Sequence, residues 1–595
     1  MIMTAGSVSA QGLGFYLGGK RVELAEGDSV NFTANSEGEV EVKVTQDGEV
    51  QVYKGEEMTF FGDVERYFMD VNNAMHYYDE RLGMHCAFGY GAIMHVRDIL
   101  TADMYRPSTG YNWFRGWAIN RVGPNSAGAQ MVWNFYEQAI AATNNLIGAI
   151  DESKASDRQK EYLGVAYAFR AMHYLDMARM YEYLPNLDTK PYSHTGRDIT
   201  HLTVPIITEK TTPSQVAQLT RATREEMRDF IQADLDKAAT YLAHYQRTSK
   251  LLPDLACVYG LQARLSMWVE DYPKAAQLAR KAIGQSGATP LTEAEMLDVE
   301  NGFNSLEPSS WMWGAQPRED DRVVTTGLCN WTSWMSNEQT FGYASFVPLC
   351  ITPSLVSNMI ADDPREKLFK TGPGETVPHL SGIDWDQLPL YASLKFRPYK
   401  GCTDNSAIAS QSAYPLMRVE EMYFIEAEAK AHSSVSEGMA LLDAFMRKYK
   451  PGYTSVEGVD AQHAIQIIVA QKRIELWGEG QSFFDYKRLD MGVDRIQDVD
   501  AQYIPEDQQL HTIGRPAWMN LSFPNRSNMM YPWNTIGQEN PDPSGIYKPG
   551  GGTVGFGESY YSVRFNDGIV RELFGLSTPS EYITLRACAM DTAQG

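Results

Sequence analysis

Residues 161–185 read EYLGVAYAFRAMHYLDMARMYEYLP and carry the clearest helical pattern of the chain. Apolar and small side chains recur there every three or four positions, which is the spacing of one face of an α-helix. Small and large side chains alternate along this face, which favours close packing against a second helix. Because Pro185 cannot continue a helix, the predicted rod ends there. The members of the face are Leu163, Tyr167, Ala171, Tyr174, Leu175, Ala178 and Tyr181.

One charged residue interrupts this apolar face. Arg170 lies on or beside the stripe, whereas Glu161, Asp176 and Arg179 flank it. Burying a guanidinium is costly unless a carboxylate or carbonyl group accepts its hydrogen bonds. We therefore expect Arg170 to belong to a structural ion pair and not to act in catalysis. We expect the same role where later helices meet, for Arg418, Arg473, Glu420 and Glu475.

Two consecutive helices at 253–270 and 272–283 have the pattern of a tetratricopeptide-type hairpin. Large and small residues alternate at the spacing of that repeat, and the small ones let the two helices approach closely. Ala279 stands where the repeat usually has a bulky aromatic residue. The matching positions are Tyr259, Ala263, Tyr272, Ala275, Ala279 and Ala282. Further helices are predicted at 63–83, 93–104, 131–150, 223–245, 415–432, 436–448, 465–477 and 483–489.

Changes of pattern divide the chain into five regions, and the predicted fold class is mainly α. Residues 13–60 alternate with period two and predict a small N-terminal β element of three to five strands. A helical scaffold is expected at 61–290 and again at 413–490. Residues 291–412 lose the helical period and predict a loop-rich, aromatic insertion with short strands and helices. Residues 491–595 predict a loop-rich region that packs on the scaffold.

Composition excludes several classes of protein. The formal net charge of −23 argues against a nucleic-acid-binding protein, which would need a basic patch. The six cysteines show no CxxC and no Cys/His ligand spacing, so neither a disulfide scaffold nor a zinc module is predicted. No apolar run is long enough for a transmembrane helix. The N-terminus lacks the features of an intact signal peptide, so we expect either a cytoplasmic protein or one whose export segment was removed.

Residues 471–489, QKRIELWGEGQSFFDYKRL, resemble the signature of the SusD/RagB family of Bacteroidetes nutrient-binding lipoproteins. That signature is R-x-E-L-x-x-E-G followed, after a small gap, by F-x-D-x-x-R. The matching residues are Arg473, Glu475, Leu476, Glu479, Gly480, Phe484, Asp485 and Arg488. Four further segments resemble the family in the same order: RAMHYLDMARMYEYLP, YPLMRVEEMYFIEAEAKAH, EGMALLDAFMRKYKPGY and YPWNTIGQENP.

The chain departs from the family pattern at three places. Ser482 stands where the family commonly has Arg, and Trp533-Asn534 replaces the usual Ile-Pro. The family's lipidation cysteine near the N-terminus is absent, because the first cysteine is Cys86. We infer that the export segment and the lipid anchor are not part of this sequence.

The resemblance implies a SusD-like fold and a non-catalytic role at the cell surface. It implies an outer-membrane lipoprotein that binds oligosaccharide or polysaccharide and delivers it to a SusC-like TonB-dependent transporter. We expect no cofactor, and because the eleven histidines show no i, i+4 pairing we expect no metal site. Some members of the family handle peptides instead of sugars, so a peptide-binding homologue is an alternative.

Aromatic residues in two loops are the candidate ligand site. A Trp or Tyr ring covers the flat C–H face of a sugar, and neighbouring amide or guanidinium groups bond its hydroxyls. Trp331 and Trp334 are three residues apart, and Trp311 and Trp313 would point the same way in a strand. The alternative is that these aromatics form the core of a loop-rich region. The predicted ligand-binding residues are Trp331, Trp334, Trp113, Arg115, Tyr111, Trp313, Asn330 and Tyr343.

Catalytic motifs are not found: there is no HExxH, no G-x-S-x-G and no P-loop. The adjacent acids Glu420 and Glu421 are more typical of a structural helix than of a glycosidase pair. A glycoside hydrolase on a helical scaffold nevertheless stays an alternative, since separation in space defines such a pair. A third alternative is a cytoplasmic tetratricopeptide scaffold, which predicts more tandem repeats than this sequence contains.

Overall fold

A computed structural model provides the three-dimensional structure of the protein. It describes residues 14–17, 20–24, 29–34, 39–46, 49–56, 58–61, 63–107, 112–114, 121–374, 379–380, 382–496, 500, 502–548, 552–553, 558–560 and 586–588. Helices dominate these residues, and the predicted mainly α fold is confirmed.

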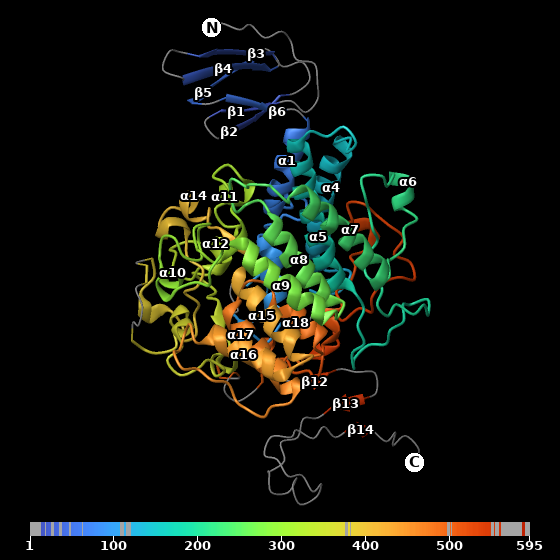
Figure 1. Ribbon diagram of the computed structural model, residues 1–595, viewed down its shortest axis with the longest axis vertical. Helices are drawn as coiled ribbons and strands as arrows, with labels where there is room; N and C mark the ends of the chain where they lie inside the picture. Colours follow the sequence, from blue (N-terminus) through green and yellow to red (C-terminus); the bar gives the residue numbers. More distant parts are fainter. Residues whose placement is uncertain are drawn as a thin grey trace, which may run out of the picture.

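The scaffold is a series of helices in which each packs against its successor (Figure 1). The first group is α4(Ala127–Ala149), α5(Asp157–Tyr181), α7(Arg224–Tyr241), α8(Leu255–Trp268) and α9(Tyr272–Ser286). The second group continues the series, because its first helix packs against both α9 and α16. Its members are α15(Val419–Ala431), α16(Val435–Met446), α17(Ala461–Glu475) and α18(Ser482–Arg488).

Helix α5 is the centre of this series. Its start is fixed by a capping box, in which Ser156 Oγ accepts from the Gln159 backbone N–H and the Gln159 side chain accepts from Ser156 N. Residues 162–178 are all buried, so the helix packs on every side and not on the single face that the sequence predicts. Gly164 allows the end of α7 to approach, since an added Cβ would lie 2.8 Å from Leu242 Cγ.

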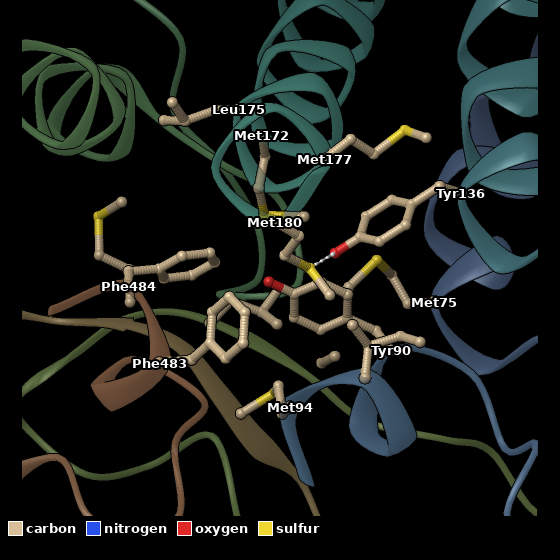
Figure 2. Close-up of a cluster of buried hydrophobic side chains, with 14 of the residues drawn as sticks. Met75, Tyr90, Met94, Tyr136, Met172, Leu175, Met177, Met180, Phe483 and Phe484 are labelled. Atoms are coloured by element: carbon tan, nitrogen blue, oxygen red, sulfur yellow. Dashed lines mark hydrogen bonds between the residues drawn. The ribbon is translucent and has the colours of Figure 1, made fainter. Parts of the chain in front are cut away.

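The C-terminal half of α5 packs in an apolar cluster rich in methionine, shown in Figure 2. Methionine is flexible and fills irregular gaps between helices. The Tyr136 hydroxyl of α4 lies 3.7 Å from the Met180 sulfur. The cluster joins α5 to α4, to α2(Tyr90–Ile99) and to α18, through residues that include Met172, Met177, Met180, Tyr136, Tyr90, Met94, Phe483 and Phe484.

Arg170 is buried and makes the ion pairs that the sequence predicts. Its Nε and Nη2 donate to the two carboxylate oxygens of Asp234 on α7, each at 2.8 Å. Its Nη1 donates to Glu209 Oε2 and to Asn144 Oδ1, also at 2.8 Å. Because these acceptors come from α7, α4 and the segment between α5 and α6(Pro213–Val216), one side chain holds three parts of the scaffold.

Helices α8 and α9 form the predicted hairpin. The four alanines of the repeat pattern, Ala263, Ala275, Ala279 and Ala282, have no exposed surface. Tyr259 and Tyr272 are half-buried at its edges. Ala279 lies on α9, which packs against α8 and also against α15, so two faces of this helix are covered.

Short elements separate the two groups of helices. They include α10(Glu293–Leu297), β8(Trp311–Ala315), α11(Arg322–Thr325), α12(Trp331–Met335), β9(Cys350–Ile351), α13(Pro353–Val356) and α14(Ser406–Ala409). The predicted start of a helix at residue 415 is wrong. Residues 414–418 form strand β10(Tyr414–Arg418), which pairs antiparallel with β8, and α15 begins only at Val419. Pro415 has no N–H, so it suits a strand with one neighbour better than a helix interior.

Two other predicted helices are shorter in the structure. The prediction at 63–83 corresponds to α1(Asp63–Asn73) and the single turn η1(Ala74–His76), and the prediction at 93–104 corresponds to α2. Strand β7(Met104–Tyr105) follows α2 and pairs with β9 of the central region. No helix in the described part of the chain is both long and apolar enough to cross a membrane.

The N-terminal β element is present as two antiparallel three-stranded sheets (Figure 1). Their strand orders are β2-β1-β6 and β3-β4-β5. Residues 47–48 lie outside the described residues, but the strands on either side pair at Gln46 and Glu49. The strands are β1(Gly14–Leu17), β2(Lys20–Glu23), β3(Ser29–Ala34), β4(Glu39–Gln46), β5(Glu49–Glu56) and β6(Met58–Phe61).

We predict that Arg170→Met lowers the free energy of unfolding by about 3–5 kcal/mol, because it leaves buried Asp234 without its bidentate partner. Chemical denaturation followed by circular dichroism measures the loss. The matched control is Lys160→Met on the exposed side of the same helix, for which we expect a change within about 0.5 kcal/mol. Equal small losses in both variants would show that the Arg170 pairs do not hold the scaffold.

Candidate functional site

The two aromatic loops of the sequence meet in space. Phe114 packs edge-on against Trp334 of α12, with ring centroids 4.8 Å apart. Trp334 stacks on Tyr343 at 4.1 Å with nearly parallel rings, and its Nε1 donates to the backbone carbonyl of His85. The His85 ring lies 5.4 Å from Trp113 and 5.7 Å from Tyr343. Three segments that are far apart in the chain therefore form one aromatic cluster.

The structure buries most of the predicted binding residues, so their prediction as exposed ligand contacts is wrong. Trp331 and Trp334 lie on the inward face of α12, where Trp331 packs against Phe396 and Tyr414 with centroids 5.1 Å away. Asn330 caps α12, because its Oδ1 accepts from Ser333 N at 2.9 Å. The buried residues of the predicted set are Trp313, Trp331, Trp334, Asn330 and Tyr343.

Strand β8 explains why the spacing of Trp311 and Trp313 misled the prediction. All five residues of β8 are buried, so both faces of the strand are covered and neither ring faces solvent. The Trp313 indole donates to the Leu251 carbonyl at 3.2 Å and packs edge-on against Phe169 of α5. Alternation along a strand identifies which residues share a face, but not whether that face is exposed.

The exposed part of the cluster is small. Phe346 follows Tyr343 by three residues in the same turn and is 64% exposed. Trp113 and His85 are partly exposed, and Tyr343 is 7% exposed. We call His85, Trp113 and Phe346 the aromatic rim, and buried Tyr343 lies beneath it. The remaining predicted residues, Tyr111 and Arg115, lie outside the described residues.

Sequence reasoning missed His85, Phe346 and the residue that holds the rim from below, Arg106. The Arg106 guanidinium is buried, and it donates to the backbone carbonyls of Trp334 at 2.7 Å and Val347 at 2.5 Å. Burial lowers its pKa to about 9. A search for aromatic residues that continued past residue 343 would have included Phe346. No motif or spacing in the neighbouring sequence identifies Arg106.

A separate groove of about 690 Å³ runs along α4. Small residues of α4 and the segments around 205–216 and 530–532 line it. Glu137 accepts hydrogen bonds from the backbone N–H groups of Met530 and Tyr531, and burial raises the pKa of its carboxyl to about 7. Tyr67, Tyr174 and Tyr531 also line the groove. Its size is in the range of small-molecule sites, so it is a rival location for a ligand.

The predicted structural ion pairs are confirmed. Arg418 is fully buried and lies 3.1 Å from Glu420, 3.1 Å from Glu475 and 3.0 Å from Glu479. Arg473 pairs with Asp103, which precedes β7. The adjacent acids 420 and 421 do not face one reacting centre, since Glu421 instead pairs with Arg264 on α8 at 2.6 Å.

Metal chemistry has no obvious location in the described residues, where no group of three or more His, Cys, Asp or Glu side chains is placed to hold an ion.

The structure thus belongs to a class of helical-repeat proteins in which loops between the helices carry a cluster of aromatic residues. Within that class, two family models match successive parts of the chain. One, described as starch-binding and associating with the outer membrane, matches residues 95–267, and the other, described as the SusD family, matches residues 319–549. The chain belongs to the SusD/RagB family.

Solved structures have the same fold. A SusD-like carbohydrate binding protein from Bacteroides vulgatus ATCC 8482 is 22% identical with a TM-score of 0.59, covering 73% of this chain and 84% of that chain. A SusD superfamily protein from the same organism is 19% identical with a TM-score of 0.60, covering 80% and 98%. A laminarin binding SusD-like protein is 18% identical with a TM-score of 0.54, also covering 80% and 98%. No curated protein matches.

We predict that Trp334→Ala lowers the free energy of unfolding by about 3–5 kcal/mol, because it leaves a cavity between Phe114 and Tyr343. Phe346→Ala, which removes an exposed ring from the same loop, should change it by less than about 0.5 kcal/mol. Urea denaturation of the two variants measures the difference. Similar small effects would place Trp334 at the surface and restore it as a ligand contact.

Proposed function

We propose that this protein is a non-catalytic binding protein of the cell surface, which captures an oligosaccharide and delivers it to a SusC-like TonB-dependent transporter. The observation that carries the proposal is the aromatic rim, in which partly exposed rings stand on a buried and hydrogen-bonded base. Family membership and the similarity to a laminarin binding SusD-like protein support a carbohydrate as ligand.

The chemistry of the rim suits a sugar. The rings of Trp113 and Phe346 offer apolar faces, and the His85 ring, whose Nδ1 bonds the Tyr343 hydroxyl, offers a polar edge beside them. Sugars present a flat C–H face bordered by hydroxyl groups, so a ring face and a polar edge side by side match both parts. A site with so few exposed rings favours weak, reversible capture over tight binding.

The base of the rim supports binding without rearrangement. Trp334 stacks on Tyr343 and donates to the His85 carbonyl, while Arg106 fixes the backbone at residues 334 and 347. A ligand that meets side chains already held in place loses less free energy to ordering the protein. We therefore propose that the rim is preformed.

In this proposal, the role in transport and the cellular location rest on family membership. A binding protein of this kind would be held at the outer membrane by a lipid anchor, and it would lie over the transporter. Two alternatives differ from this proposal in the ligand that is bound or the product that is released. They are a peptide-binding homologue, and a glycoside hydrolase on a helical scaffold.

We predict that Trp113→Ala and Phe346→Ala each weaken glycan binding five- to thirty-fold, as expected for about 1–2 kcal/mol from one ring. Affinity electrophoresis against laminarin, starch and other neutral polysaccharides identifies a ligand, and calorimetry with its oligosaccharides measures the dissociation constant. Neither variant should lose stability comparable to Trp334→Ala.

The groove along α4 supplies the control. Asn145 is exposed on α4 and lines the groove, so Asn145→Trp fills it without touching the rim. Binding that is lost in Asn145→Trp and kept in Trp113→Ala would move the site to the groove. Release of reducing ends by the wild type would favour the hydrolase, and binding of peptides with no glycan retained would favour the peptide-binding homologue.

A further inference from the structure

A small charged cavity lies where six helices of the scaffold converge. Its volume is about 40 Å³, and α5, α7, α8, α15, α17 and α18 all contribute to its wall. One water molecule needs about 10–15 Å³ of such volume. The cavity therefore has room for about three water-sized bodies, which is enough for a small ion but not for an organic ligand.

Positive charge exceeds negative charge around this cavity. Three carboxylates face it, from Glu182, Glu421 and Asp485. Two further carboxylates lie behind the wall, where Asp176 pairs with Arg179 and with buried Arg97, and Glu428 pairs with Arg488. Counting Arg97, seven cationic side chains meet these five carboxylates. The six cationic side chains that line the cavity are Arg179, Arg224, Arg264, Lys472, Lys487 and Arg488.

Two of the guanidinium groups have N–H donors to spare. Arg264 is 3% exposed, and it uses Nε and Nη2 on the two oxygens of Glu421 and Nη2 again on the Leu416 carbonyl. Arg179 uses Nη2 on Asp176 and Nε on the Leu175 carbonyl. Within the described part of the chain, no acceptor is found for Nη1 of either residue. Both residues line the cavity, so their Nη1 groups are available there to an anion or to water.

The cationic side chains also disfavour one another's protonated forms. Burial lowers the pKa of Arg179, and the nearby Arg264 and Arg97 contribute to the shift. Burial, together with Arg515, Arg221 and Arg224, lowers the pKa of Lys487 well below its usual value. At the outer edge, Glu270 lies 3.9 Å from Arg224 but is largely exposed, so solvent screens its charge.

We infer that this cavity binds a small inorganic anion, with chloride as the occupant that fits its size. A halide would accept hydrogen bonds from the unused N–H groups of Arg264 and Arg179. Its negative charge would offset the surplus positive charge. The small volume of the cavity favours a monatomic halide over a larger oxyanion such as sulfate. The inference is independent of the proposed glycan site.

The position of the cavity indicates what the anion would do. Phe484, Asp485 and Arg488 belong to the family signature on α18, and all three line the cavity opposite Arg179 of α5 and Arg264 of α8. An anion held between these helices would contribute to docking the signature segment on the scaffold. Chloride would thus be a structural ion that stabilises the fold and leaves the ligand specificity of the rim unchanged.

Thermal unfolding in chloride tests the inference. Wild-type protein is compared in sodium chloride, from about 5 to about 500 mM, with sodium gluconate making up constant ionic strength. A ten-fold excess over the dissociation constant should raise the melting temperature by about 1–3 °C. Arg179→Met should abolish the rise, because Asp176 keeps its pair with Arg97 while the spare donor is removed. Arg158→Met, exposed on the same helix, should keep it.

Bromide locates the ion directly and does not depend on the stability of a variant. Wild-type crystals grown in sodium bromide should show an anomalous peak inside the cavity, within hydrogen-bonding distance of Arg264 Nη1. A melting temperature that is the same in chloride and gluconate, or a cavity that contains only water in bromide, would overturn the inference. A rise with sulfate as large as with chloride would also overturn the assignment of a halide.

Discussion

The buried guanidinium of Arg418 has to be neutralised, and its partners join the second group of helices to the central region. Arg418 ends strand β10, while the carboxylates of Glu475 and Glu479 lie at the end of α17 and in the turn beyond it. Lys395, from the central region, donates to the same Glu479 at 2.6 Å. Removing one member of this network would leave the remaining charges buried without a partner. The resulting loss of free energy is larger than the net contribution of the ion pair to stability. The start of α15 and the end of α17 are therefore held together.

The same turn continues the connection towards the aromatic rim. The Gly480 N–H donates to Asp98 of α2 at 2.8 Å, and an added Cβ at Gly480 would lie 2.8 Å from Met94 Cα. Two residues of α17 and the turn then hold the chain after α2, since Arg473 pairs with Asp103 and Trp477 donates to its carbonyl. Asp103 lies three residues before Arg106, which carries the rim. The signature segment therefore supports the rim through the chain that follows α2.

Sequence reasoning predicted what depends on local pattern and failed where burial decides. The helix around Arg170, the alanine-rich hairpin and the need of Arg170 and Arg418 for acceptors all follow from spacing and charge. Trp313, Trp331 and Trp334 were predicted as ligand contacts because composition alone does not distinguish a loop that covers itself from one that opens to solvent. Strand β10 was predicted as helix because its partner, β8, lies about a hundred residues earlier. Arg106 carries no local signal at all, since its acceptors are backbone atoms more than two hundred residues away.

Arg106 donates its hydrogen bonds in the segment it supports to main-chain carbonyls, and its guanidinium lies over the buried Trp334 ring. Carbonyl groups are the same whatever side chain stands beside them, so substitutions at solvent-facing positions such as Phe346 leave this anchor intact. The structural support of the proposed binding surface and the chemical selectivity of that surface can therefore change independently in evolution. A lineage could exchange the rings that meet a new nutrient while inheriting the same support, and diversification of ligand preference would not have to begin with a loss of folding.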